Sequence, residues 1–203
     1  MPRRPAPVRA APGRPRSQRA RRAVLDAARA LFEEGGYPAA TVEAIAARSG
    51  VAKTTIYRRW ANRAALLVDV LVEEASTVAP PPAPGDPIRA LRAELRRIAV
   101  AANGFSGRLL TSLLGEAQQD RDVRTALLDG LFYPRRQASA EAIRRAQASG
   151  ALRSDVPPGL ATDLIFGPLF FRVFLQHEPV TKAFVARAFR YLQEGLRRTP
   201  RPR

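Results

Sequence analysis

Four prolines lie between Pro80 and Pro84, within the stretch VAPPPAPGDP at residues 78–87. Proline lacks the backbone N–H that helices and sheet ladders need, so neither a helix nor a central strand can continue through this stretch. A short proline-rich segment also acts as a stiff spacer between folded parts. The sequence therefore predicts a folded unit on each side of it, which we place at residues 18–79 and 86–199.

Apolar residues on both sides of this segment recur with the 3.6-residue period of a helix. In the first domain we expect four helices. The first ends at Gly35-Gly36, and the second runs from the N-cap Thr41 to Arg48. The third runs from Ala52 to Trp60, and the fourth begins after a cap at Asn62. In the second domain they cover residues 87–103, 107–118, 120–149 with a break near Pro134, 157–176 and 179–198. No stretch sustains the alternation of apolar and polar residues that a strand needs. The predicted fold class is all-α.

Basic residues outnumber acidic ones by 34 to 18, which gives a formal net charge of +16. Residues 1–17 contain five arginines and no acidic residue, a composition typical of a disordered basic arm that lies on a polyanion. A solvated terminus without a partner is the alternative for this stretch. The overall charge favours a nucleic-acid partner.

Residues that carry catalysis or hold metals are scarce. The chain has no cysteine, and its single histidine, His177, falls in a predicted turn. Glu116 and Asp120 lie four positions apart, but no nucleophile accompanies them. We therefore expect no metal site, no cofactor and no enzymatic activity. The most apolar run, residues 164–175, is shorter than the roughly 20 residues of a membrane span, so we expect a cytoplasmic protein without a membrane partner.

The stretch SGVAKTTIYRRW, residues 49–60, joins two short predicted helices through a turn that contains Gly50. Glycine adopts the left-handed conformation that such a turn needs at little cost. Ile45, Val51 and Ile56 supply a small core between the two helices. Two short helices joined in this way after a longer supporting helix make a helix-turn-helix, a motif that often binds DNA.

Polar and basic side chains of the second helix are left outside that core. Short polar side chains at the start of a recognition helix can read base edges, and the cations and hydroxyls beside them can bind phosphates. The candidate DNA-contacting residues are Thr41, Lys53, Thr54, Thr55, Tyr57, Arg58 and Arg63. Arg58 is preferred to Arg59 because adjacent helix positions point about 100° apart. Trp60 is expected in the core, where burial of a large aromatic side chain stabilises the fold.

The same region resembles the N-terminal domain of TetR-type transcriptional regulators. The resemblance covers residues 18–78 and is carried by Thr41-Val42, Ile45-Ala46, Ser49-Gly50-Val51, Thr55, Tyr57, Trp60 and Leu66. Trp60 stands where the family usually has Phe, and Arg63 where it commonly has Lys. Residues 166–185 resemble the C-terminal domain of one TetR subgroup. The resemblance implies an N-terminal three-helix helix-turn-helix domain and a C-terminal helical ligand-binding and dimerisation domain, in a homodimer that usually represses transcription.

The second domain carries the candidates for an effector pocket and a dimer interface. Phe105, Phe132 and Phe170 are candidates to line the pocket, and core packing is the alternative role for these aromatics. The dimer is expected to form through the last two helices, at about 160–175 and 181–198, because the first of them is apolar nearly all round. The interface candidates are Phe171, Phe174, Phe189 and Leu192.

The predicted function is a sequence-specific DNA-binding transcriptional regulator. We expect a homodimeric repressor that binds a palindromic operator in double-stranded DNA and is released by an unknown small-molecule effector. The alternative is a non-specific architectural nucleic-acid-binding protein, which the net charge would also permit.

Overall fold

The computed structural model describes residues 14–78 and 85–196, and the described residues form helices and no strand. The helices are α1 (Arg14–Ala39), α2 (Val42–Ser49), α3 (Lys53–Tyr57), α4 (Arg63–Val78), α5 (Pro87–Ala102), α6 (Phe105–Ala117), α7 (Arg121–Leu127), the π-helical segment η1 (Leu128–Phe132), α8 (Tyr133–Ala148), α9 (Pro158–Leu175) and α10 (Lys182–Leu196). The all-α prediction is therefore confirmed. The prolines at 80–84 lie outside the described residues.

Helix α1 begins at Arg14, inside the stretch 1–17 that was expected to be a disordered arm. Proline is tolerated in the first turn of a helix, where its missing N–H has no partner to lose, so Pro15 does not prevent this start. Residues 1–13 lie outside the described residues. The part of the predicted arm that can be compared with the structure is thus helical.

Local capping contacts set the boundaries of the first four helices. The backbone of α1 leaves helical geometry at Gly35 and Gly36, and Gly36 has a φ of 68°. Thr41 Oγ1 accepts a hydrogen bond from the Ala44 N–H at 3.1 Å, and Asn62 Oδ1 accepts one from the Ala65 N–H at 2.8 Å. Gly50 follows α2 with a φ of 67°. These predicted boundaries are confirmed.

The third helix is shorter than the sequence predicted. It spans five residues and ends at Tyr57, whereas the prediction continued to Trp60. The chain turns after Tyr57 and buries the Trp60 ring in the core. The predicted break near Pro134 is the π-helical segment η1, which has wider turns than an α-helix. It ends just before α8, and Pro134 lies in the first turn of α8.

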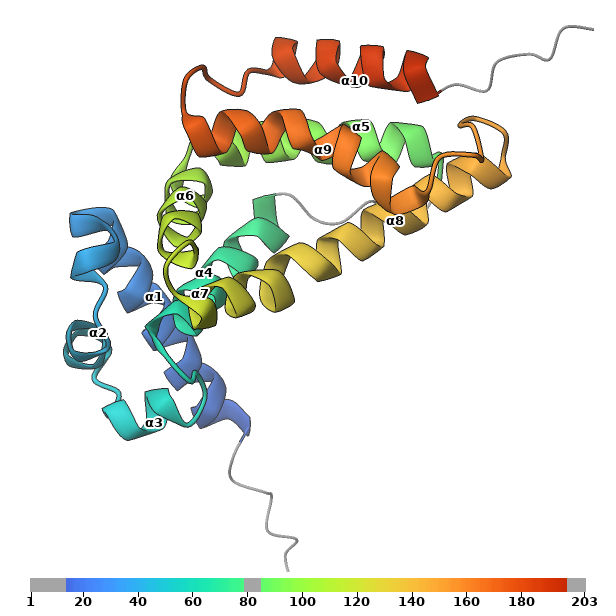
Figure 1. The fold of residues 1–203 in the computed structure, drawn as a ribbon. Coiled ribbons are helices and arrows are strands. Elements are labelled where there is room, and N and C mark those ends of the chain that lie inside the picture. Colours follow the sequence, from blue (N-terminus) through green and yellow to red (C-terminus); the bar gives the residue numbers. More distant parts are fainter. Residues whose placement is uncertain (1–13, 79–84, 197–203) are drawn as a thin grey trace, which may run out of the picture.

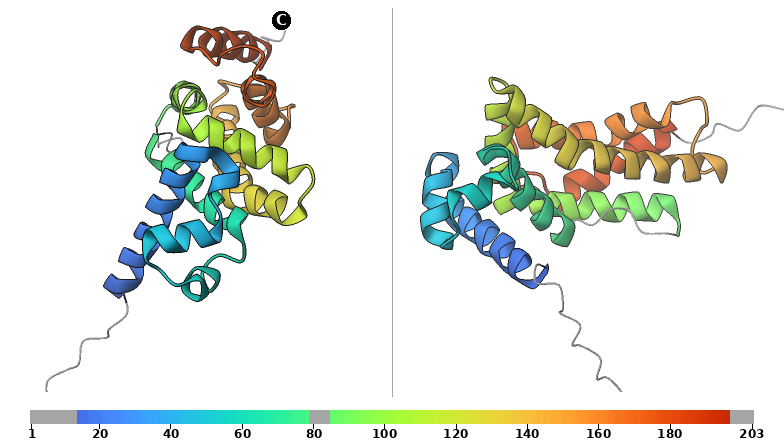
Figure 2. Two further views of the ribbon diagram at one scale, coloured as in Figure 1. Left: turned by 90° about the vertical axis from the view of Figure 1, so that its left-hand side faces the viewer. Right: turned by 90° about the horizontal axis from the view of Figure 1, so that it is seen from below.

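Helices α1, α2 and α3 form one end of the molecule, α9 and α10 form the opposite end, and α4 lies between them beside α7 (Figure 1). Helix α8 runs from α7 toward the far side and packs on α5 and α9, while α10 lies along α5 and α9 (Figures 1 and 2). Helix α6 lies between the two ends and contacts α1, α4, α5 and α9. A change in the C-terminal part of the fold can therefore reach the helix-turn-helix through packed helices.

The hydrophobic core does not divide at the proline segment. One cluster of buried residues joins the first four helices to α6, α7 and η1, and a second joins α5, α8, α9 and α10. Phe32 of α1 meets Phe105 of α6 edge to face, with ring centroids 5.6 Å apart. The N-terminal helices thus share a core with α6 and α7, which follow the proline segment in the chain.

Candidate nucleic-acid interface and ligand pocket

Helix α3 presents its polar side chains to solvent and its apolar side chain to the core. Ile56 is buried, whereas Lys53, Thr54 and Arg58 are exposed and Thr55 is half-buried. The Tyr57 side chain is 50% exposed although it is aromatic. The face left open by α3 therefore consists of hydroxyls and cations, which are the groups that bind base edges and phosphates.

Lys53 is paired with a carboxylate of the preceding helix. Its Nζ lies 3.2 Å from Oε1 of Glu43, and both side chains are more than half exposed. A hydrogen bond from the Glu43 backbone N–H, followed by the contact with Lys53, lowers the pKa of Glu43 below its usual value. An exposed pair of this kind exchanges partners readily, so the ammonium can move from Glu43 to a phosphate or a base.

Arg63 and Thr41 lie at the two helix starts beside α3. The Arg63 guanidinium stacks over the Tyr37 ring at 3.9 Å from its centroid, and its Nη1 donates to the Tyr37 carbonyl oxygen at 3.5 Å. Thr41 Oγ1 serves as the N-cap of α2, and its side chain is half-buried. Both residues therefore have a structural contact in the free protein besides their predicted contact with DNA.

Asp69 fixes the position of the helix-turn-helix, and the sequence reading did not single it out. Its Oδ2 accepts hydrogen bonds from Trp60 Nε1 and from Arg21 Nη2, each at 3.0 Å. The carboxylate thus joins the residue after α3 to α1 and α4. The sequence feature that could have pointed to Asp69 is an acidic residue placed between Val68 and Val70 in a mostly apolar stretch.

Three further arginines on α1 and α8 are occupied by structural partners. Arg22 pairs with Glu73 at 3.0 Å, Arg29 pairs with Glu74, and Arg135 of α8 donates to the Ala75 carbonyl oxygen at 3.0 Å. Much of the positive charge on α1 thus holds α1 against α4. Ion pairs thus occupy Arg22 and Arg29 of α1, whereas Thr54, Tyr57 and Arg58 are exposed on and directly after α3.

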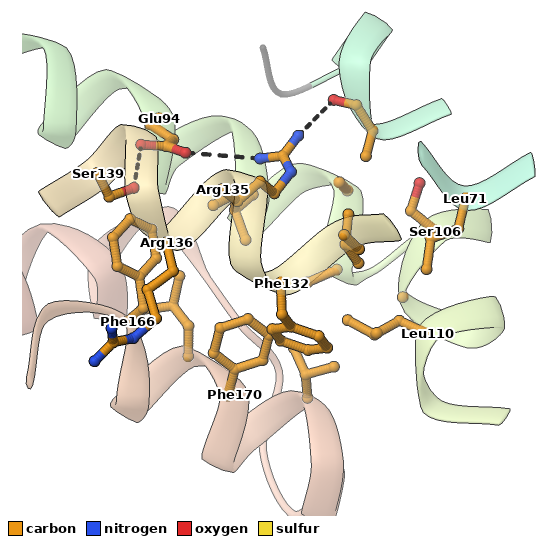
Figure 3. Close-up of a pocket in the computed structure, with 18 of the residues that line it drawn as sticks. Leu71, Glu94, Ser106, Leu110, Phe132, Arg135, Arg136, Ser139, Phe166 and Phe170 are labelled. Atoms are coloured by element: carbon orange, nitrogen blue, oxygen red, sulfur yellow. Dashed lines mark hydrogen bonds and ion pairs between the residues drawn. The ribbon is translucent and has the colours of Figure 1, made fainter. Parts of the chain in front are cut away.

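A pocket of about 170 Å³ lies in the C-terminal half, between α4, α5, α6, α8 and α9 (Figure 3). Its walls are mostly apolar, and they include Leu71 and Ala75 of α4. The rings of Phe132, Phe166 and Phe170 form one side, with Phe132 and Phe170 centroids 5.3 Å apart. An apolar pocket with a few polar groups is the usual form of a small-molecule site.

The polar end of the pocket is built around a buried carboxylate. Glu94 is 1% exposed, its Oε1 lies 3.6 Å from Nη1 of Arg135, and Ser139 Oγ donates to its Oε2 at 3.5 Å. Burial raises the pKa of Glu94 to about 7, although Arg135 and Arg97 act in the opposite direction. Burial likewise lowers the pKa of Arg135 from its usual value. Sequence reasoning missed this cluster because each residue alone looks like an ordinary charge on a helix.

One of the three predicted pocket residues lies elsewhere. Phe132 and Phe170 line the pocket, but Phe105 does not. The Phe105 ring packs against Phe32 in the first core cluster and has the Arg29 guanidinium 4.6 Å above its centroid. The prediction for Phe105 is wrong because helical periodicity shows which side chains are apolar but not which neighbour covers them.

Apolar side chains of α9 lie exposed along one side of the helix. Leu160, Leu164, Phe171, Phe174 and Leu175 recur at helical spacing, and Phe171 and Phe174 are 59% and 47% exposed. We call these five residues the α9 stripe. Phe189 of α10 is only 3% exposed and packs in the second core cluster, so its assignment to a subunit interface is wrong; Leu192 is half-buried.

By length and composition alone, α9 could also cross a membrane, and it is the one helix in the described part of the chain that could. The apolar run of residues 164–175 sits in a helix of 18 residues, which lies within the predicted bounds 157–176. One third of the helix is buried within the fold, and core helices of soluble proteins pass the same test. Among residues 14–78 and 85–196, no group of three or more His, Asp or Glu side chains could hold a metal ion.

Comparisons with known proteins agree with this arrangement. Residues 24–70 match the family described as bacterial regulatory proteins of the tetR family, and residues 81–192 match the tetracyclin repressor-like C-terminal domain. The uncharacterized HTH-type transcriptional regulator YdeS of Bacillus subtilis is 31% identical over 173 residues, which cover 85% of this chain and 87% of that protein. The chain belongs to the TetR family.

Solved structures of TetR-family proteins share its fold. The TetR family transcription regulator SCO0332 is 34% identical, with a TM-score of 0.76 over 89% of this chain and 99% of that one. FadR of Thermus thermophilus, solved in complex with lauroyl-CoA, is 23% identical, with a TM-score of 0.65 over 90% and 99% of the two chains. As a TetR-family member, the chain is a helix-turn-helix DNA-binding transcriptional regulator.

Proposed function

We propose that this TetR-family regulator is a homodimeric repressor that binds a palindromic operator and is released by a small molecule. The observation that carries the proposal is the open polar face of α3, at the opposite end of the molecule from the α9 stripe (Figure 1). The proposed DNA-binding surface is then at one end of the molecule and the proposed subunit contact at the other, and the pocket lies between them. The operator would be in the cytoplasm.

The proposed DNA contacts divide into two groups. Lys53, Thr54 and Thr55 lie at the start of α3, where a recognition helix enters the major groove and reads base edges. Tyr57, Arg58, Arg63 and Thr41 flank them and would bind phosphates. Arg59 is a weaker candidate, since its guanidinium lies 5.5 Å from the centroid of the Trp60 ring.

The proposed dimer forms through the α9 stripe and the adjacent side of α10. The stripe exposes two phenylalanines and three leucines, which makes a contiguous apolar strip on a helix that otherwise packs in the core. Across a two-fold axis, such a strip would meet the same strip of the second subunit. Two copies of α9 and α10 would then make a four-helix bundle, with Phe189 supporting the interface from inside each subunit.

Coupling between pocket and DNA would pass through α4. Leu71 and Ala75 of α4 line the pocket, and Arg135 at its polar end donates to the Ala75 carbonyl. A Cβ placed on Gly130 of η1 would lie only 2.8 Å from Cγ1 of Val68, so η1 and α4 touch closely. A ligand that displaces Phe132 or Arg135 would shift α4 and change the spacing of the two recognition helices.

The test is a titration of fluorescent DNA taken from the region beside its own gene, with unlabelled random DNA as competitor. Sequence-specific binding predicts that an excess of random DNA leaves most of the complex intact. Stoichiometric loss of the complex would instead support the architectural alternative. A direct measurement of mass by sedimentation in the same buffer separates one dimer per site from a single subunit.

A further inference from the structure

We propose that the effector is a compact uncharged molecule, about one ring in size, whose single neutral oxygen forms a hydrogen bond with Ser106. This inference rests on the proposed ligand-released function and names the ligand class of the same pocket. It follows from the volume of the pocket, from its apolar walls, from the pairing of its charged side chains and from one hydroxyl group that no described residue pairs with.

The volume limits the ligand to roughly one ring with small substituents. The pocket measures about 170 Å³. An apolar cavity of about 150 Å³ engineered in another protein binds benzene, so a ligand of roughly six to ten non-hydrogen atoms is the size that fits here. Pockets for drug-sized ligands begin at about 300 Å³. A fatty acyl thioester of coenzyme A is therefore too large for this pocket.

The walls of the pocket are apolar and partly aromatic. Phe132 of η1 and Phe166 and Phe170 of α9 line it, and Leu71 and Leu110 line it from α4 and α6 (Figure 3). Aromatic rings pack edge to face or offset at centroid distances of about 4.5 to 7 Å. The Phe132 and Phe170 rings are 5.3 Å apart and tilted by 46°, so they already pack in this way. A ligand ring can extend this packing, and burial of its apolar surface then drives binding.

The charged side chains that line the pocket balance one another. Arg135 lies 3.6 Å from the buried Glu94, and Arg136 donates to Asp163 through two hydrogen bonds of 3.0 and 2.8 Å. Each guanidinium on the lining thus has a carboxylate partner within the protein. A charged ligand would lose its hydration in this pocket without gaining a counter-ion, which makes its burial costly. An uncharged ligand avoids this cost.

One hydroxyl group on the lining remains for a ligand. Ser139 Oγ donates to Glu94 at 3.5 Å, and Thr162 Oγ1 donates to the Pro158 carbonyl oxygen at 2.9 Å. Ser106 of α6 lines the same pocket and is 8% exposed, and no described residue forms a hydrogen bond with its hydroxyl group. A hydroxyl that is buried without a partner is destabilising, so a ligand oxygen that pairs with Ser106 gains affinity. A neutral hydroxyl or carbonyl group on the ligand supplies that oxygen.

The ligand class is tested with four probes that share a 4-methylphenyl ring. Binding of 4-methylbenzyl alcohol, 4-ethyltoluene, 4-methylbenzylamine and 4-methylbenzoate to the full chain is measured by calorimetry at neutral pH without DNA. The first two are uncharged, the amine is a cation and the benzoate is an anion. We expect the alcohol to bind at least tenfold more tightly than either ion. An ion that binds as tightly as the alcohol, tighter binding of lauroyl-CoA, or no binding of the alcohol would each overturn the inference.

Ser106→Ala tests the hydrogen bond, and 4-ethyltoluene is the reference because a methyl group replaces the hydroxyl of the alcohol. We expect the variant to fold and to lower the affinity for the alcohol about three- to tenfold, while the affinity for the hydrocarbon stays unchanged. Ser112→Ala is the matched control, because Ser112 lies on the same helix and does not line the pocket. Equal affinity for the alcohol in the two variants would overturn the assignment to Ser106. A parallel loss for alcohol and hydrocarbon would also overturn it, because the variant would then have changed the shape of the pocket.

Release from DNA is measured separately, so that the two proposals can fail independently. The operator complex is titrated with 4-methylbenzyl alcohol. Alcohol binding without release would leave the ligand class standing and overturn the release step of the proposed function. Release by lauroyl-CoA but not by the alcohol would overturn the ligand class and support the release step.

Discussion

Among single residues, Lys53 and Glu43 form an exposed ion pair on the face that we propose contacts DNA. The carboxylate lies 3.2 Å from the ammonium, and both side chains are more than half exposed. Glu43→Gln removes one negative charge from that face, so we expect a few-fold rise in DNA affinity at low salt that shrinks as salt increases. Glu141→Gln on α8 is the control, since it removes the same charge far from α3. A rise of equal size in both variants would show that only net charge matters.

Glu94 makes the free energy of unfolding depend on pH between the usual pKa of a glutamate, 4.5, and its raised pKa of about 7 in the folded protein. The folded-state pKa of about 7 lies above the usual value of 4.5, so between these values the folded protein holds a proton that the unfolded chain has lost. Glu94 therefore lowers the free energy of unfolding by up to about 1.4 kcal/mol for each unit that pH rises in this window. Above the window the loss is complete, and below it the group has no effect.

The Glu94 prediction is checked by denaturant unfolding of wild type and Glu94→Gln at pH 5 and pH 8. We expect wild type to lose stability relative to the variant between these values. The carboxylates of Glu34, Asp155 and Asp163, whose pKa values hydrogen bonds from arginines lower, titrate at lower pH and are present in both proteins. A stability difference that stays constant with pH would contradict the assignment.

At the scale of helices, the contact between η1 and α4 carries the proposed coupling. Gly130→Ala would bring a Cβ to 2.8 Å from Cγ1 of Val68, which is buried on α4, so the Val68 side chain, α4 or η1 must shift. We expect a loss of about 1 to 3 kcal/mol in stability and a change in DNA affinity. Gly115→Ala on α6 is the matched control, because nothing lies within 4 Å of its added Cβ. Unchanged DNA affinity in Gly130→Ala would remove η1 from the coupling path.

The helices themselves could be predicted closely because their ends are set by local chemistry. Thr41, Gly50 and Asn62 act through neighbours within four residues, and such signals are visible in a sequence. The partners of each helix could not be predicted in the same way. Phe105 and Phe189 have the apolar pattern expected of a pocket or an interface, yet both are buried by helices distant in the chain. Glu94 and Arg135 likewise meet across 41 positions.

At the scale of the whole molecule, the exposed α9 stripe is the proposed subunit interface, whereas Phe189 belongs to the core. Phe171→Glu places a charge on an exposed position, so we expect the folded subunit to persist while the dimer dissociates and operator affinity falls. Phe189→Glu is the contrasting variant, because this side chain is buried and its replacement should unfold the C-terminal half. Sedimentation and circular dichroism distinguish the two. A dimeric Phe171→Glu protein would place the interface elsewhere.

Sequence-specific recognition of DNA by two copies of α3 is the central claim, and selection of bound sequences from a random DNA pool tests it most directly. Two recognition helices related by a two-fold axis contact half-sites about one helical turn, roughly 34 Å, apart or a multiple of it. The expected result is enrichment of one palindromic sequence, with Lys53→Ala altering the preferred bases within each half-site. A bound pool that remains random, or a selected sequence without two-fold symmetry, would contradict the account.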